Sequence, residues 1–230
     1  MTTTANNEQD FFLKKHRGPH PAATGIVHAA LFIAALVSFG VCSHGAAFPT
    51  PFLAPEVAQK ILLEAPLAIR LHAFFLFGSA VPLGIFTAAV TSRLSFLGVN
   101  VTGVSIGLVG GVIASVCMVA SGLCMWVLSQ PGVATEVHVM HTVQLLAFAT
   151  GGVAYIVFAG LLMAGIAIPC LLGRYTPAWV AWLGIVLAVI AELSFFGLLF
   201  FPLSYLLPLV RYGSFVWMIA TGFTLKKQRG

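Results

Sequence analysis

"HVMHTVQLLAFATGGVAYIVFAGLLMAGIAIPCL", residues 138–171, decides the fold class of this chain. The stretch contains no Asp, Glu, Lys or Arg. It is longer than the roughly 20 residues that an α-helix needs to cross the hydrocarbon core of a bilayer. Backbone groups inside a bilayer must be hydrogen-bonded within the protein, and apolar and polar residues do not alternate with period two here. The stretch therefore predicts a membrane-spanning helix and not a strand of a β-barrel.

The whole chain has the same character. It has 230 residues, of which 60% are hydrophobic and only 7% are charged, and its mean hydropathy is +1.03. A soluble domain carries about 25% charged residues. We predict an all-α fold, a polytopic transmembrane bundle of six helices in one domain, 24–225, with basic tails at 1–23 and 226–230. The predicted spans are 24–43, 68–92, 99–128, 138–171, 177–201 and 203–225.

The longest predicted connection follows the first span. Within it, "EVAQKILLEA" (56–65) places Val57, Ile61, Leu62 and Ala65 at helical spacing. This pattern predicts a short amphipathic helix that lies on the outer interface of the membrane.

The basic residues are distributed unevenly between the two sides of the predicted bundle. By the positive-inside rule, the side with more Lys and Arg is cytoplasmic, so both termini are expected there in a multi-pass protein of the cell inner membrane. The net charge of +5 thus follows from topology and does not indicate nucleic-acid binding. Because 24–43 is a full span, residues 1–23 are expected to be a tail and not a signal peptide. The cytoplasmic group is Lys14, Lys15, Arg17, Arg93, Arg174, Lys226, Lys227 and Arg229, and the outer group is Lys60 and Arg70.

Small residues recur every four positions in the third span, at Gly103, Gly107, Gly111 and Ser115. Such a row lets two helix backbones approach closely. It fits either packing inside the bundle or a dimerisation face. The expected partners are membrane lipid and, through the Gly103/Gly107/Gly111 face, a second copy or a larger membrane complex.

Two charged residues, Glu192 and Arg211, are predicted to lie well within the spans. At 1.5 Å per residue both lie roughly 12–14 Å from the outer end of their helices. An intramembrane charge is costly and usually faces a partner inside the bundle. We therefore predict that Glu192 and Arg211 form a buried pair or share a polar pocket. The pair could handle a ligand, a proton or a substrate, or it could be a structural ion pair.

Other polar side chains gather at the outer ends of the predicted helices. His72 lies about one turn into the second span, beside Arg70, and the fourth span opens with "EVHVMHTVQ" (136–144). These positions predict a polar pocket in the extracytoplasmic half that binds a small ligand. Its candidate residues are His72, His141, Glu192, Arg211, Arg70, Tyr212 and Gln144.

A metal site or a haem is an alternative use of the same histidines. His138 and His141 are three residues apart and share a helix face, so with His72 they could bind zinc or copper. A single haem b would need His72 and His141 to face each other. Equally, each histidine could simply contact water and lipid headgroups.

Two further sets of residues lie near the ends of the predicted spans. His28 begins the first span on the cytoplasmic side and is not expected to join the outer pocket. Cys42 and Cys124 both lie near the outer face, where the environment is oxidising, and could form a disulfide.

Several functions remain open from the sequence. The chain could bind a small ligand, a metal or haem. It could be a membrane enzyme acting on a lipid-soluble substrate, with Glu192 as acid or base. It could also be a transporter, or an accessory subunit of a larger membrane complex.

The runs "RLHAFFLFGSAVPLGIF" (70–86), "SRLSFLGV" (92–99), "LSQPGV" (128–133) and "RYGSFVWMIATGF" (211–223) are similar to those of a family of small, uncharacterised bacterial six-span membrane proteins. The resemblance covers most of 68–225. It implies a compact six-helix fold, and it carries no catalytic motif.

Overall fold

The computed structural model describes residues 18–226. Within this range six helices are long and apolar enough to cross a membrane, which confirms the all-α fold and identifies a multi-pass membrane protein. The first three are α2 (Pro21–Cys42), α4 (Pro66–Phe96) and α5 (Thr102–Leu128). The fourth joins α6 (Val137–Phe148), η1 (Ala149–Ala154) and α7 (Tyr155–Leu172). The fifth joins α8 (Ala178–Leu193) and η2 (Ser194–Leu198), and the sixth joins η3 (Phe201–Tyr205) and α9 (Leu206–Thr224).

Proline marks the start of several helices. Pro21, Pro55 and Pro66 occupy the first turns of α2, α3 (Pro55–Glu64) and α4. A proline is tolerated there because the first backbone N–H groups of a helix have no partner inside the helix. α2 begins within the predicted N-terminal tail 1–23, and the rest of the two predicted tails lies almost entirely outside the described residues. α4 continues through Pro82.

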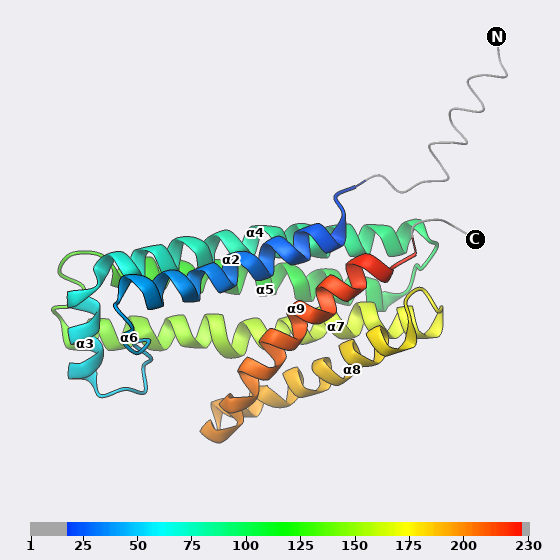
Figure 1. Ribbon diagram of the computed structural model, residues 1–230. Coiled ribbons are helices and arrows are strands. Elements are labelled where there is room, and N and C mark those ends of the chain that lie inside the picture. Colours follow the sequence, from blue (N-terminus) through cyan, green and yellow to red (C-terminus); the bar gives the residue numbers. More distant parts are fainter. Residues whose placement is uncertain (1–17, 227–230) are drawn as a thin grey trace, which may run out of the picture.

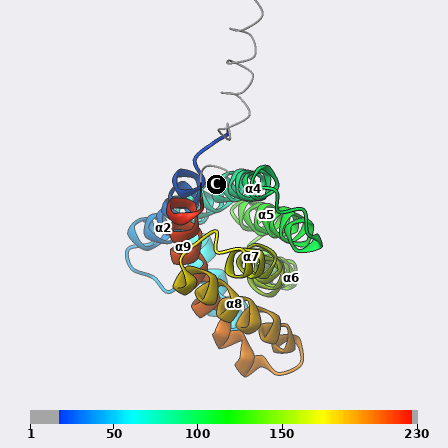
Figure 2. The same cartoon turned by 90° about the vertical axis from the view of Figure 1, so that its right-hand side faces the viewer.

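The helices form an antiparallel bundle (Figures 1 and 2). Each spanning helix packs on the next one in the sequence, and α9 returns to pack on α2. α3 lies across one end of the bundle and not along the spans (Figure 1). It buries Ala58 and Leu62, one helical turn apart, and exposes Val57. The predicted amphipathic helix is therefore confirmed, although Ala58 and not Val57 faces the protein.

The glycines of α5 are used inside the bundle. A Cβ at Gly103 would lie 3.4 Å from the carbonyl oxygen of Gly165 on α7, and one at Gly107 would lie 3.2 Å from Ile166 Cδ1. Gly111 faces Thr87 of α4. The close approach that these glycines permit thus joins α5 to α7 and α4, as one of the two sequence interpretations expected.

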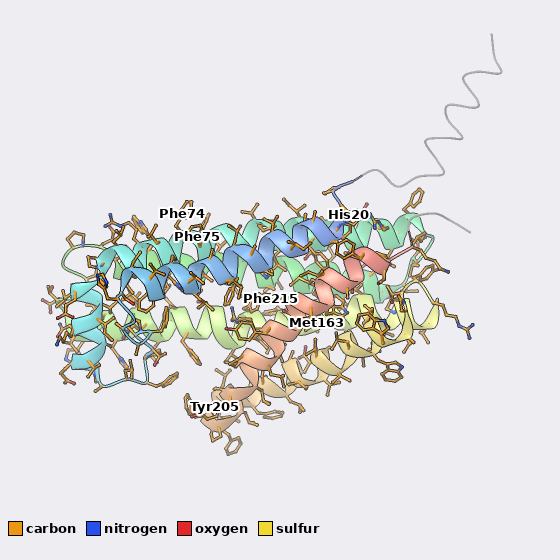
Figure 3. All side chains as sticks on the ribbon, in the orientation of Figure 1. His20, Phe74, Phe75, Met163, Tyr205 and Phe215 are labelled. Carbon is orange, nitrogen blue, oxygen red and sulfur yellow. The ribbon has the colours of Figure 1, made fainter. Side chains whose placement is uncertain are left out.

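α9 crosses the bundle obliquely (Figure 1). At its C-terminal end it packs closely on α2, where a Cβ at Gly25 would lie 3.4 Å from Met218 Cβ. Phe215 points from α9 towards α2 (Figure 3), with its ring centroid 5.3 Å from those of His28 and Phe32. Towards its N-terminal end α9 runs away from α2, and the turn that carries Tyr205 lies apart from α3 (Figure 3). This divergence makes room for a cavity in the half of the bundle that carries α3, which we call the outer half.

Candidate ligand cavity

A cavity of about 310 Å³ lies between the outer halves of the helices. Most of its wall is apolar, and Arg211 is the single charged residue that lines it. α2, α4 and α5 contribute Phe32, Leu36, His72, Leu76, Ser121 and Met125. α6 and η1 contribute Gln144, Ala147, Phe148, Gly151 and Gly152. The remaining wall comes from the connection after α2, Phe48, Pro49, Thr50 and Pro51, and from Ser204, Leu207, Pro208, Arg211 and Tyr212.

Arg211 reaches the cavity from the second turn of α9. Its Nη2 donates a hydrogen bond to the carbonyl oxygen of Gly151. Its Cζ lies 4.5 Å from the ring centroid of Tyr155 and 4.9 Å from that of Phe32, so the cation is held between two aromatic faces. The ion pair found among residues 18–226 is Lys60–Glu64, on α3, and Arg211 has no acidic partner there.

The predicted pair of Glu192 with Arg211 is therefore wrong. Glu192 lies on the exposed side of α8, with its carboxylate over Gly160 of α7. The buried positions of α8 include Ala188 and Ala191. Since successive residues of an α-helix are rotated by about 100°, Glu192 falls off that buried stripe. Equal depth along two helices did not place the two side chains on facing sides.

The carbonyl group that Arg211 binds belongs to a π-helical turn, η1, in the middle of the fourth span. A π-turn widens the helix and is found frequently at functional sites. Ser121 of α5 donates a hydrogen bond to Ala147 O at 2.9 Å, and a side chain at Gly151 would collide with the Ser121 hydroxyl. Contacts from α5 and α9 therefore hold the widened turn on both sides.

His72 lines the cavity with its imidazole anchored. Its Nδ1 lies 2.9 Å from Ala35 O on α2, and its ring packs 4.8 Å from that of Phe48. A carbonyl oxygen only accepts hydrogen bonds, so Nδ1 carries a proton, and in the neutral ring Nε2 is an acceptor. His28 makes the matching bond at the other end of the same helix pair, from Nδ1 to Ser79 O at 2.8 Å. As expected, His28 does not line the cavity.

Gln144 ties the outer wall in place. Its Nε2 donates a hydrogen bond to Pro49 O at 3.0 Å, across 95 residues of sequence. We call residues 45–54 the outer segment. Phe52 fixes the same segment through ring contacts of 4.9 Å with Phe148 and 4.4 Å with Phe201. The outer segment thus covers the cavity through contacts to α6 and η3.

The structure brings together four of the predicted pocket residues and leaves out three. His72, Gln144, Arg211 and Tyr212 line the one cavity. His141 is half-buried but does not line it, and Arg70 and Glu192 are exposed. Among the lining residues that sequence reasoning missed are Phe32, Ser121, residues 48–51 of the outer segment and the Gly151–Gly152 pair. Two adjacent glycines in the middle of an apolar span were the one available signal, because glycine is costly inside a helix unless a close approach requires it.

The predicted metal set does not assemble. The part of the chain that the structure describes contains no group of three or more His, Cys, Asp or Glu side chains that could hold a metal ion. His138 is exposed on α6, and His141 does not line the cavity that His72 lines. The two facing histidines needed for the proposed haem are absent from the cavity wall, because His141 is not part of it. Cys42 and Cys124 are free thiols and form no disulfide.

Chemically, the cavity offers one fixed cation, one imidazole acceptor and a long apolar wall. This combination suits a molecule with an anionic or strongly accepting head and an apolar body.

Comparisons with known protein families, with curated proteins and with solved structures found no match to this chain. The function therefore has to be inferred from the cavity itself.

Proposed function

We propose that the protein binds a small amphipathic anion, a lipid-soluble acid, in the outer-half cavity, with the anionic head on Arg211. The observation that carries this proposal is that Arg211 lines an otherwise uncharged, largely apolar cavity and has no acidic partner. A charge within a membrane-spanning bundle costs at least about 2.5 kcal/mol unless it is paired. The Gly151 carbonyl and the rings of Phe32 and Tyr155 offset part of this cost. An anionic ligand would offset the rest.

The dimensions and walls of the cavity support the same ligand class. A volume of about 310 Å³ is that of a small-molecule site. Phe32, Leu36, Leu76 and Met125 provide an apolar surface for a hydrocarbon body. The ligand would lie with its head at Arg211 and its body along these side chains.

The test uses the purified full-length protein with a fluorescent fatty acid bound to it. Decanoate and decanol, which have the same hydrocarbon chain and differ in charge, are compared as competitors of this probe. We expect decanoate to displace the probe at a lower concentration than decanol does. In Arg211→Gln the affinity for decanoate should fall at least about tenfold, because a hydrogen bond to a charged group contributes about 1.5–3 kcal/mol. The affinity for decanol should be unchanged.

Lys60→Gln is the matched control, since it also removes one positive charge but lies on α3 outside the cavity. Equal displacement by decanoate and decanol, or an equal loss of decanoate affinity in Lys60→Gln, would refute the proposal. Arg211→Lys separates charge from geometry, because lysine keeps the charge and loses the planar donor set.

A membrane enzyme acting on a lipid-soluble substrate is the alternative. The observation that favours it is the anchored imidazole of His72, whose Nε2 is free to accept a proton from a molecule in the cavity. Glu192 lies outside the cavity, so His72 takes the acid–base role that the sequence suggested for Glu192. Chemical change of a lipid-soluble acid during incubation with the wild type, and its loss in His72→Phe with decanoate binding retained, would favour the enzyme.

We further propose that the membrane is the bacterial inner membrane and that both termini are cytoplasmic. The resemblance of 70–86 and 211–223 to bacterial six-span proteins supports the first part. The charges of the two ends support the second. Arg93, Arg174 and Lys226 lie at the end that carries residues 18 and 226, whereas Lys60 and Arg70 lie at the end that carries α3, together with Glu56, Glu64 and Glu136. A homo-oligomer or a larger complex also stays a proposal, and it would use a face other than Gly103/Gly107/Gly111, which is occupied.

A further inference from the structure

A second cavity, larger than the first, opens at the inner ends of α5 and α7. Its volume is about 750 Å³, and its floor is the place where Gly103 and Gly165 bring the two helices together. Ile106, Ile168 and Leu172 form its rims, and Leu172 is 80% exposed. We call this cavity the inner groove. Because its rims are apolar and lie on membrane-spanning helices, they face lipid chains and not water.

One end of the inner groove is polar, and two basic residues lie beside it. Asn100 and Tyr175 line it there. Lys226 donates its backbone N–H to Tyr175 O at 3.1 Å, and its Nζ lies 5.7 Å from the Tyr175 ring centroid. Arg174, next to Tyr175, is exposed. The four acidic residues between 18 and 226, Glu56, Glu64, Glu136 and Glu192, all belong to the outer half, so none of them neutralises these two cations.

We propose that the inner groove binds an anionic phospholipid of the leaflet that surrounds this end of the bundle. One acyl chain would lie between Ile106 and Ile168, and the phosphate would lie at Lys226 and Arg174, within reach of the Tyr175 hydroxyl. The apolar walls select a hydrocarbon chain, and the two cations select a head with net negative charge over a zwitterionic head. This site lies at the opposite end of the bundle from the Arg211 cavity and does not depend on the ligand proposed there.

The experiment measures the retention of added lipids by the purified full chain, using native mass spectrometry after delipidation in detergent. The probes are dioleoylphosphatidylglycerol, dioleoylphosphatidylcholine and inorganic phosphate. We expect one phosphatidylglycerol to be retained in preference to phosphatidylcholine, and phosphate alone not to displace it. Removing each cation, as in Arg174→Gln and Lys226→Gln, should weaken phosphatidylglycerol binding roughly fivefold, since each basic residue near an anionic lipid surface contributes about 1 kcal/mol.

A second variant tests the acyl chain separately from the charge. Ala164 lines the groove, and Ala164→Phe would fill it, which should lower the retention of both lipids. Val189→Phe, on the exposed face of α8, is its control, and Lys60→Gln is the control for charge. Equal retention of the two lipids, an equal effect of Lys60→Gln, or displacement by inorganic phosphate would each overturn the proposal.

Discussion

His28 and His72 donate hydrogen bonds in opposite directions across the same pair of helices. His28 on α2 donates to Ser79 O on α4, and His72 on α4 donates to Ala35 O on α2. In each helix the donor and the acceptor are seven residues apart, which is two helical turns or about 10.5 Å. The two bonds are therefore symmetric in an antiparallel pair and fix its register at two levels. Both histidines are buried.

The first prediction concerns these two bonds. His28→Phe and His72→Phe should each lower the free energy of unfolding by about 1 kcal/mol, between the average of about 0.6 kcal/mol and the maximum of about 1.7 kcal/mol for hydrogen bonds between membrane helices. Unfolding of the purified protein by SDS in mixed micelles measures the change. His138→Phe, at an exposed position, should change it by less than about 0.5 kcal/mol. A variant at His28 or His72 as stable as the wild type would show that the bond does not hold the helices.

The second prediction follows from the separation of Glu192 and Arg211. Because they form no ion pair, the effects of Glu192→Gln and Arg211→Gln on the free energy of unfolding should add to within about 0.5 kcal/mol in the double variant. The same SDS titration measures all four proteins of the cycle. A coupling above about 1 kcal/mol would mean that the two side chains do interact in the membrane.

The third prediction concerns the contact of α5 with α7. A Cβ at Gly110 would lie 2.7 Å from Leu161 Cβ and 2.7 Å from Phe158 O. Gly110→Ala must therefore push the helices apart, and such overpacking costs about 1–3 kcal/mol. Gly40 on α2 has open space around its Cβ position, and Gly40→Ala should be neutral or stabilising by up to about 1 kcal/mol. Thermal unfolding of the two variants, measured side by side, tests the difference, and equal melting temperatures would contradict it.

The fourth prediction concerns the outer segment. Phe52→Ala removes the ring contacts to Phe148 and Phe201, each of which contributes about 0.5–1.5 kcal/mol beyond its buried area. We expect faster amide hydrogen exchange in residues 45–54 and no change in α5. Phe74→Ala, on the outer surface of α4 (Figure 3), is the matched control and should leave exchange in the segment unaltered. Unchanged exchange in Phe52→Ala would mean that the bond between Gln144 and Pro49 is sufficient to hold the segment.

The fifth prediction tests the orientation in the membrane. In a variant in which Cys42, Cys117, Cys124 and Cys170 are replaced by alanine, a cysteine at Glu136 should react in intact cells with a maleimide that cannot cross the membrane. A cysteine at Asn100 should react only after the membrane is permeabilised. The reverse pattern would invert the proposed topology.

Sequence reasoning located the helices well because span length and hydropathy are properties of a segment alone. The ends of the predicted spans 138–171 and 177–201 fall within a few residues of the observed ends at Val137, Leu172, Ala178 and Leu198. The inclination of α9 and the direction in which Glu192 points depend on how helices pack against each other. The depth of a residue along its own helix does not reveal how helices pack, which is why the Glu192–Arg211 pair was predicted in error.

The cavity was predictable only in part, and for the same reason. His72, Gln144, Arg211 and Tyr212 stand out in the sequence because polar residues in apolar spans are rare. Phe48 and Ser121 do not, because phenylalanine and serine are common in loops and helices of membrane proteins. The place of Phe48 in the wall follows from the folding of the outer segment over α4 and α6, and that of Ser121 follows from the packing of α5 on α6. His28 was assigned no partner because nothing in one helix reveals which carbonyl of another helix it will meet.

The π-turn of the fourth span acts as one additional residue inserted into an otherwise regular helix. One residue corresponds to a rotation of about 100°, and the turn absorbs this rotation, so the buried stripe stays on one side of the span although its sequence positions shift by one. Met140, Gln144 and Ala147 before the turn and Ala159, Met163 and Ile166 after it are all buried. In a straight α-helix of the same sequence, the second group would be rotated by about 100° from the first. The extra residue in this short segment, more than any side chain within it, therefore keeps the wall of the cavity and the tightly packed half beyond it in one rotational phase.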